Sequence, residues 1–178
     1  MKDTNIYTEN SIRTYTGKVF DLKIMDPDSI CIEDIAHALS NTARFGGHLN
    51  RLYSVAQHSC YVAINSSKEN MLAALLHDAS EAYIGDMPSP FKSMMPDYQE
   101  IENRLMAVIA KKFGFQFPLV EEIHREDQNM FQVEWRELVL GDNPESYQSP
   151  ERAEKLFLDM FYQIMENQKV NESASNTP

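Results

Sequence analysis

The composition describes a small acidic protein. The chain has 178 residues, 43% of them hydrophobic, and a formal net charge of −11. This length and apolar content are sufficient for one domain with a core large enough to surround a site. The negative charge disfavours binding to a nucleic-acid polymer, because the phosphate backbone is bound by basic surfaces. A small phosphorylated substrate is not excluded, since it needs only a few local cations.

The sequence also limits the compartment. It has no charged-then-apolar leader at its N-terminus and no apolar run near the roughly 20 residues that a membrane span requires. We therefore expect a cytoplasmic protein without a membrane partner. Cys31 and Cys60 are not in CxxC spacing, which argues against a disulfide scaffold or a cysteine-rich zinc site.

Residues 1–27 are predicted to form an extended opening. The segment SIRTYTGKVFDL alternates, contains β-branched and aromatic side chains, and has a turn signal at Gly17. It precedes a break at Asp26-Pro27-Asp28. This pattern predicts a short β-hairpin.

Helices are predicted after the hairpin. The first is short and covers about residues 33–40. Ser54 and Gln57 have the spacing of a capping box, which predicts a helix that begins at about Val55 and has His58 in its first turn.

The next helix is predicted over about residues 70–84, because an apolar run leads to a glycine at Gly85. Asp97, together with a glutamate three residues later, predicts the start of a helix that ends before Gly114. Pro118 then predicts the start of a further helix.

This further helix is predicted to run to about Leu140. Ser149 and Pro150 have the residue types of an N-cap and a first helical position, and they predict a final amphipathic helix. The polar segment 167–178 is predicted to be a disordered tail. Residues 1–166 would then form a single, mostly helical domain.

The stretch LLHDASEAYIGD, residues 75–86, places His77, Asp78, Glu81 and Asp86 directly after an apolar run. Positions three and four apart share one face of a helix, so Asp78 and Glu81 should be neighbours. Carboxylates this close in a partly apolar setting repel each other and are poorly solvated. A divalent metal would relieve both costs, and we therefore predict a metal site. The alternative is that His77 is a hydrogen-bonded core histidine.

Other helices must complete such a site. His58 is the best candidate for a second imidazole. Asp127 could supply a second carboxylate, but spacing alone does not distinguish it from Glu126 or Glu134. Two imidazoles and two carboxylates would suit Mn²⁺, Fe²⁺, Co²⁺ or Zn²⁺, with positions left open for water or substrate.

Several segments resemble a known family. The segments ICIEDIAHALSNTARFGGHLNRLYSVAQHS, LLHDASEAYIGDMPSPFK and MPDYQEIE are similar to the HD-domain phosphohydrolases, in particular to small bacterial and phage members related to the 5′-deoxynucleotidase branch. The resemblance covers about residues 14–139. It implies an all-α fold, an HD-domain helical bundle with a short N-terminal β-hairpin.

The resemblance also implies a ligand set for one divalent transition metal, Mn, Co, Fe or Zn. The ligands would be His58, His77, Asp78 and Asp127. The last of these follows from aligning REDQNMFQVEWREL with the family's helical pattern D-x-x-M/L-x-x-x-E-x-R. The chain departs from the nucleotidase at Phe45, where the nucleotidase has a tryptophan.

Roles for further residues follow from the chemistry that the resemblance implies. Glu81 or Asp86 would accept or orient the proton of the attacking water, and the other would serve the leaving group. Arg44 is the expected phosphate clamp, because a planar guanidinium can donate two hydrogen bonds to phosphate. Further expected substrate contacts are Lys92, His48 and Phe45. Lys92 could instead be a solvated surface lysine. Phe45 could stack on a base or contribute only to packing.

We therefore expect a metal-dependent phosphohydrolase that converts deoxynucleoside 5′-monophosphates to deoxynucleoside and phosphate. One alternative is a triphosphohydrolase that acts on nucleotides such as dATP and releases triphosphate. A second alternative is a non-catalytic HD-fold nucleotide sensor. The expected partners are the nucleotide and further copies of the chain in a homo-oligomer.

Overall fold

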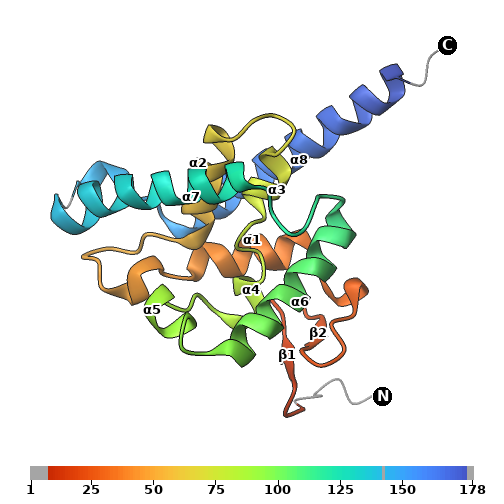
Figure 1. Cartoon of the computed structure of the whole chain (residues 1–178), viewed down its shortest axis with the longest axis horizontal. Coiled ribbons are helices and arrows are strands. Elements are labelled where there is room, and N and C mark those ends of the chain that lie inside the picture. The colour runs from red at the N-terminus through yellow and green to blue at the C-terminus, as the bar shows by residue number, and fades with distance from the viewer. Residues whose placement is uncertain (1–7, 142, 176–178) are drawn as a thin grey trace.

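The core is centred on three helices, two from the first part of the chain and one from its C-terminal end. The structure is a computed structural model that describes residues 8–141 and 143–175. Helices α1 (Ile32–Asn41), α2 (Val55–Asn65) and α8 (Pro150–Ser175) pack against one another, and α8 extends beyond the body of the molecule (Figure 1). Their facing side chains, which include Ile35 and Phe157, are fully buried. The mostly helical fold confirms the predicted all-α class.

The predicted hairpin is confirmed. Strands β1 (Ser11–Arg13) and β2 (Val19–Asp21) pair antiparallel. The turn between them is held on α1, because Asp34 accepts hydrogen bonds from the backbone N–H and the hydroxyl of Thr16, at 2.7 and 2.9 Å. Phe20 on β2 is buried in the core. A short 3₁₀ turn, η1 (Pro27–Ser29), follows at the predicted break.

Helix α2 begins at Val55, as predicted, and half of the capping box forms. The Ser54 hydroxyl accepts a hydrogen bond from the Gln57 backbone N–H at 3.2 Å. The Gln57 side chain does not return to Ser54. It donates to the Ser146 carbonyl at 2.6 Å and accepts from the Gln148 N–H at 3.1 Å, and so it holds the loop around η4 (Pro144–Ser146) against α2.

The prediction of one helix over residues 70–84 is wrong. The segment forms two short helices, α3 (Met71–Leu75) and α4 (Glu81–Ile84), joined by a turn over residues 76–80. The His77 Nδ1–H donates to the Ala74 carbonyl at 2.7 Å. In a continuous helix this carbonyl would accept from the N–H of Asp78, so the imidazole competes with the helix at the point where it breaks.

The later helices are close to prediction. Helix α6 (Pro96–Phe113) ends at Gly114, which has a left-handed φ of 81°, but it begins before Asp97, which lies in its first turn. Helix α7 (Glu121–Glu134) begins after Pro118 rather than at it. It continues to Leu140 as η3 (Trp135–Leu140), a π-helical segment. A short helix, α5 (Ser89–Lys92), precedes α6.

The last helix has the predicted cap. The Ser149 hydroxyl accepts a hydrogen bond from the Arg152 N–H at 3.3 Å, and α8 begins at Pro150. The segment 167–178, which we expected to be a disordered tail, is helical as far as Ser175, and residues 176–178 lie outside the described part. Within the described residues, none of the helices combines the length and hydropathy needed to cross a bilayer.

Candidate metal centre

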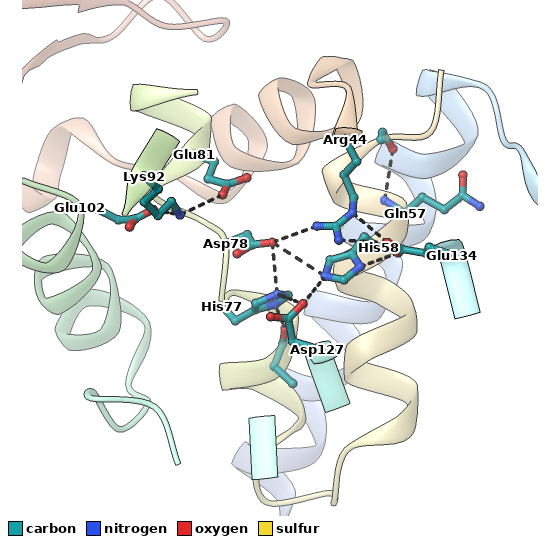
Figure 2. A network of polar contacts seen from close by, with 12 residues as sticks. Arg44, Gln57, His58, His77, Asp78, Glu81, Lys92, Glu102, Asp127 and Glu134 are labelled. Carbon is teal, nitrogen blue, oxygen red and sulfur yellow. Dashed lines mark hydrogen bonds and ion pairs between the residues drawn. The ribbon is translucent and has the colours of Figure 1, made fainter. Parts of the chain in front are cut away.

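Local structure brings the candidate residues to one place. The bridge between Ala43 and Ser54, together with the hydrogen bond from the Arg44 N–H to the Tyr53 carbonyl at 2.9 Å, closes the loop that leads into α2. Arg44 at the start of η2 (Arg44–Gly47) is therefore held beside the first turn of α2, which contains His58. Figure 2 shows this arginine facing the same group of side chains as the residues of the 76–80 turn and of α7.

Three of the four predicted ligands form a compact group, which we call the metal cluster. It consists of His58, His77 and Asp127, and one ligand atom from each lies within 4.8 Å of the others. The Asp127 Oδ1 atom is 3.0 Å from His58 Nε2 and 3.9 Å from His77 Nε2. These three residues could hold a metal ion.

The fourth predicted ligand, Asp78, lies at the edge of the metal cluster. Its Oδ2 atom is 3.1 Å from His77 Nε2 and 3.9 Å from His58 Nε2 (Figure 2). The side chains of Asp78 and Asp127 are 21% and 42% exposed, whereas that of His58 is completely buried. The carboxylates therefore form the side of the site that is open to solvent.

The tautomer of His77 fits a metal ligand. Because its Nδ1–H donates to the Ala74 carbonyl, the neutral ring has its lone pair on Nε2. Among the described residues this buried Nε2 atom makes no well-aligned hydrogen bond, although Asp78 Oδ2 lies 3.1 Å away. Burial alone would lower the pKa of His77, but Asp78 and Asp127 raise it to about 9. A bound cation would replace the proton that this pKa places on Nε2, because the negative potential of the two carboxylates stabilises either charge.

Glu134 connects the metal cluster to Arg44. Its carboxylate is 1% exposed and accepts a hydrogen bond from His58 Nδ1–H at 2.5 Å and from Arg44 Nε at 3.1 Å. Burial raises the pKa of Glu134, but the hydrogen bond from His58 and the charge of Arg44 lower it below its usual range. A carboxylate at Nδ1 fixes the ring so that Nε2 faces Asp127, an arrangement typical of histidines that bind metal.

Glu134 occupies the glutamate position of the helical pattern with which Asp127 was aligned, but its role between His58 and Arg44 was not predicted. The usable signal was its spacing from Asp127. The two residues are seven positions apart, which is close to two helical turns and places them on one face of α7.

The predicted catalytic carboxylates lie beyond Asp78. Glu81 is 5% exposed, and its Oε2 atom has no hydrogen-bond partner within the described chain. Burial, with a smaller effect of Asp78 and Asp86, raises the pKa of Glu81 well above its usual value. Burial also raises the pKa of Asp86, an effect that Arg44 opposes and Asp78 reinforces. These two residues therefore favour a proton more than ordinary surface carboxylates do.

Lys92 is held among carboxylates rather than in free solvent. Its Nζ atom donates to Glu102 Oε1 at 2.7 Å and lies 3.8 Å from Glu81 Oε1. In Figure 2, Lys92 and Glu81 lie on the side of Asp78 away from the histidines. This position favours an electrostatic role next to Glu81.

The remaining predicted substrate contacts differ in position. Arg44 lies with its Nη1 atom 3.9 Å from Asp78 Oδ2, so it is part of the site. The Phe45 ring packs against Phe131, with 6.0 Å between ring centroids. His48 is exposed at the end of η2.

The fold and the site define a helical-bundle protein with a candidate metal centre. No family model matches the chain. It is 41% identical over 131 residues to the uncharacterized protein YfdR of Escherichia coli K12, and the match covers 74% of each chain. It is 39% identical over 123 residues to an uncharacterized protein of Rhodobacter capsulatus, with 64% of this chain and 63% of that protein covered. The chain belongs to the YfdR family.

We expect Asp127→Asn to lose metal binding. The substitution removes the charge of the carboxylate that faces both imidazoles, so affinity for Mn²⁺ should fall by more than the roughly 10- to 100-fold typical of an outer hydrogen-bond partner. Titration calorimetry with Mn²⁺ on the purified protein measures this. The matched control is Glu126→Gln, because Glu126 interacts with Arg125 and Asn129 and is not part of the metal cluster. Equal affinity of the two variants would contradict the assignment.

Glu134→Gln should weaken metal binding without removing a ligand. A neutral amide accepts the His58 N–H more weakly and removes the shorter of the two ion pairs of Arg44, so Mn²⁺ affinity should fall roughly 10- to 100-fold. The control is Glu137→Gln, since Glu137 pairs with Arg136 at the surface. Calorimetry and thermal unfolding are measured on both. Wild-type Mn²⁺ affinity in Glu134→Gln would show that the carboxylate does not position His58.

Proposed function

We propose that the protein is an HD-domain phosphohydrolase that uses one divalent transition metal to hydrolyse deoxynucleoside 5′-monophosphates. The observation that carries the proposal is the position of Arg44, whose Nη1 atom lies 3.9 Å from Oδ2 of Asp78 at the edge of the metal cluster. A metal ion and a guanidinium at one opening form a site for a phosphate group. The resemblance of residues 14–139 to the 5′-deoxynucleotidase branch supports the deoxynucleotide class.

When bound, the metal ion would act as a Lewis acid on a phosphoryl oxygen and lower the pKa of a water molecule. His58, His77, Asp78 and Asp127 would hold it. Arg44 would neutralise a second phosphoryl oxygen. Because its Nε and Nη2 atoms are engaged by Glu134, its Nη1 atom is the group directed toward the substrate. Glu134 thus presents the guanidinium in a fixed orientation, which reduces the entropy lost when phosphate binds.

Glu81 and Asp86 would carry the proton transfers. Glu81 is buried and has an unpartnered oxygen, so it can exchange a proton with a water or with the leaving oxygen without first losing a strong hydrogen bond. Lys92 is 3.8 Å away and would balance the charge when Glu81 is ionised. These spare carboxylates favour an enzyme over a nucleotide sensor, since binding alone does not require them.

The experiment that tests the proposal is a hydrolysis screen with identification of products. Deoxynucleoside mono- and triphosphates are incubated with the protein and Mn²⁺, Co²⁺, Fe²⁺ or Zn²⁺, and the products are separated by ion-exchange chromatography. We expect inorganic phosphate from monophosphates, and none after exhaustive chelation. Release of intact triphosphate would favour the triphosphohydrolase alternative. The absence of any hydrolysis with all four metals would favour the sensor.

Glu81→Gln and Asp86→Asn should retain metal and fold but lose turnover. General acid or base catalysis contributes about a hundredfold to ten-thousandfold, so kcat should fall within that range while KM changes little. Metal content, thermal unfolding and steady-state kinetics are measured on the same preparations, with Glu100→Gln on the exposed side of α6 as the control. Loss of metal in Glu81→Gln would instead make Glu81 a ligand, and near-normal kcat in both variants would remove their catalytic role.

A further inference from the structure

Three aromatic side chains gather beside the metal cluster, and the proposed chemistry uses none of them. Phe45, Phe131 and Trp135 form this aromatic cluster, in which each ring centroid lies 6.0 to 6.4 Å from the other two. The rings come from η2, α7 and η3. Trp135 is 43% exposed, so one of the largest apolar side chains of the protein faces solvent here.

Two irregular backbone segments meet at the aromatic cluster. Phe45 has φ 56° and ψ 29°, a left-handed conformation that is unfavourable for a bulky residue. Trp135 is the first residue of the π-helical segment η3, and such segments are rare and frequent at functional sites. Together the two irregularities orient the rings of two distant segments toward each other.

The aromatic cluster adjoins the phosphate-binding side of the site. Phe131 follows Asp127 by four residues, which is a displacement of about 6 Å along the helix axis. Arg44 directly precedes Phe45, and its guanidinium carbon is 5.7 Å from the centroid of that ring. The guanidinium of Arg44 and the carboxylate of Asp127 therefore lie near an aromatic surface on which the Trp135 ring is exposed. A ligand that bridges the guanidinium and this surface would carry a phosphate and a planar apolar group.

We propose that Trp135 is the surface on which the base of the substrate stacks, with Phe131 and Phe45 holding its ring in place. This inference rests on the proposed function, and it specifies which part of the nucleotide the protein recognises outside the phosphate. Stacking on an aromatic face is available to every base and contributes similarly to each. The site therefore accepts purine and pyrimidine deoxynucleotides and discriminates against sugar phosphates that carry no base.

The composition provides a direct probe, because Trp135 is the single tryptophan of the chain. Deoxyadenosine, thymidine and 2-deoxyribose 5-phosphate are titrated into the wild-type protein with Mn²⁺ while tryptophan emission is recorded. The two nucleosides carry a base and no phosphate, whereas the sugar phosphate carries a phosphate and no base. We expect saturable quenching by both nucleosides and unchanged emission with the sugar phosphate. Emission that responds to neither nucleoside would overturn the proposal.

Two variants separate stacking from general packing. Trp135→Leu should raise KM for deoxynucleoside monophosphates about 5- to 100-fold with little change in kcat, since it removes stacking far from the reacting phosphorus. Trp135→Phe keeps a stacking face and should retain most of the affinity. Thermal unfolding and Mn²⁺ content should match wild type in both variants.

The outcomes also distinguish this inference from the proposed function. If the wild-type protein does not hydrolyse nucleotides, the dissociation constant for deoxyadenosine still tests the stacking surface by calorimetry. Hydrolysis that continues with an unchanged KM in Trp135→Leu would overturn the inference and leave the phosphohydrolase intact. The exposed ring could also be covered by a second copy of the chain. A change of sedimentation coefficient in Trp135→Leu without loss of nucleoside affinity would assign the ring to that contact and overturn the proposal.

Discussion

The site depends on one buried carboxylate. Glu134 lies 1% exposed between His58 and Arg44, and a buried charge is tolerated only when its partners compensate for lost hydration. The compensating groups are His58, which lies on α2, and Arg44, which lies in the loop before α2. Because both partners are needed, α2, α7 and the loop at Arg44 must be assembled together. The orientation of the imidazole and that of the guanidinium are therefore set by the same interaction.

A second constraint acts at the turn over residues 76–80. The hydrogen bond from Nδ1 of His77 to the Ala74 carbonyl interrupts the helix and leaves Nε2 facing the carboxylates of Asp78 and Asp127. A continuous helix would place His77 and Asp78 about 100° apart around its axis. In the broken segment the Asp78 carboxylate lies 3.1 Å from His77 Nε2. The break in the helix thus allows the adjacent side chains of His77 and Asp78 to face the same site.

Local signals made much of the fold predictable. The hairpin, the Ser54 and Ser149 caps and the end of α6 at Gly114 each depend on residues a few positions apart, and all were predicted correctly. The break after Leu75 was missed, because it depends on a side chain that competes for a backbone carbonyl. The role of Glu134 was missed because its partners, Arg44 and His58, are distant in the sequence and become neighbours only in the folded chain.

The choice of Asp127 among the acidic residues of α7 shows how the fold resolves what spacing could not. Glu126 is adjacent to Asp127, but it lies about 100° around the helix and interacts with Arg125. Asp127 and Glu134 lie on the face of α7 toward α2. Asp127 contacts Nε2 of His58, and Glu134 contacts Nδ1 of the same ring. Phe131 occupies the turn between them and contacts Phe45. One helix face therefore supplies a candidate ligand, the group that orients a second ligand, and part of the aromatic cluster. A rotation of α7 about its axis would displace all three at once, and the buried ion pair of Glu134 with Arg44 opposes such a rotation.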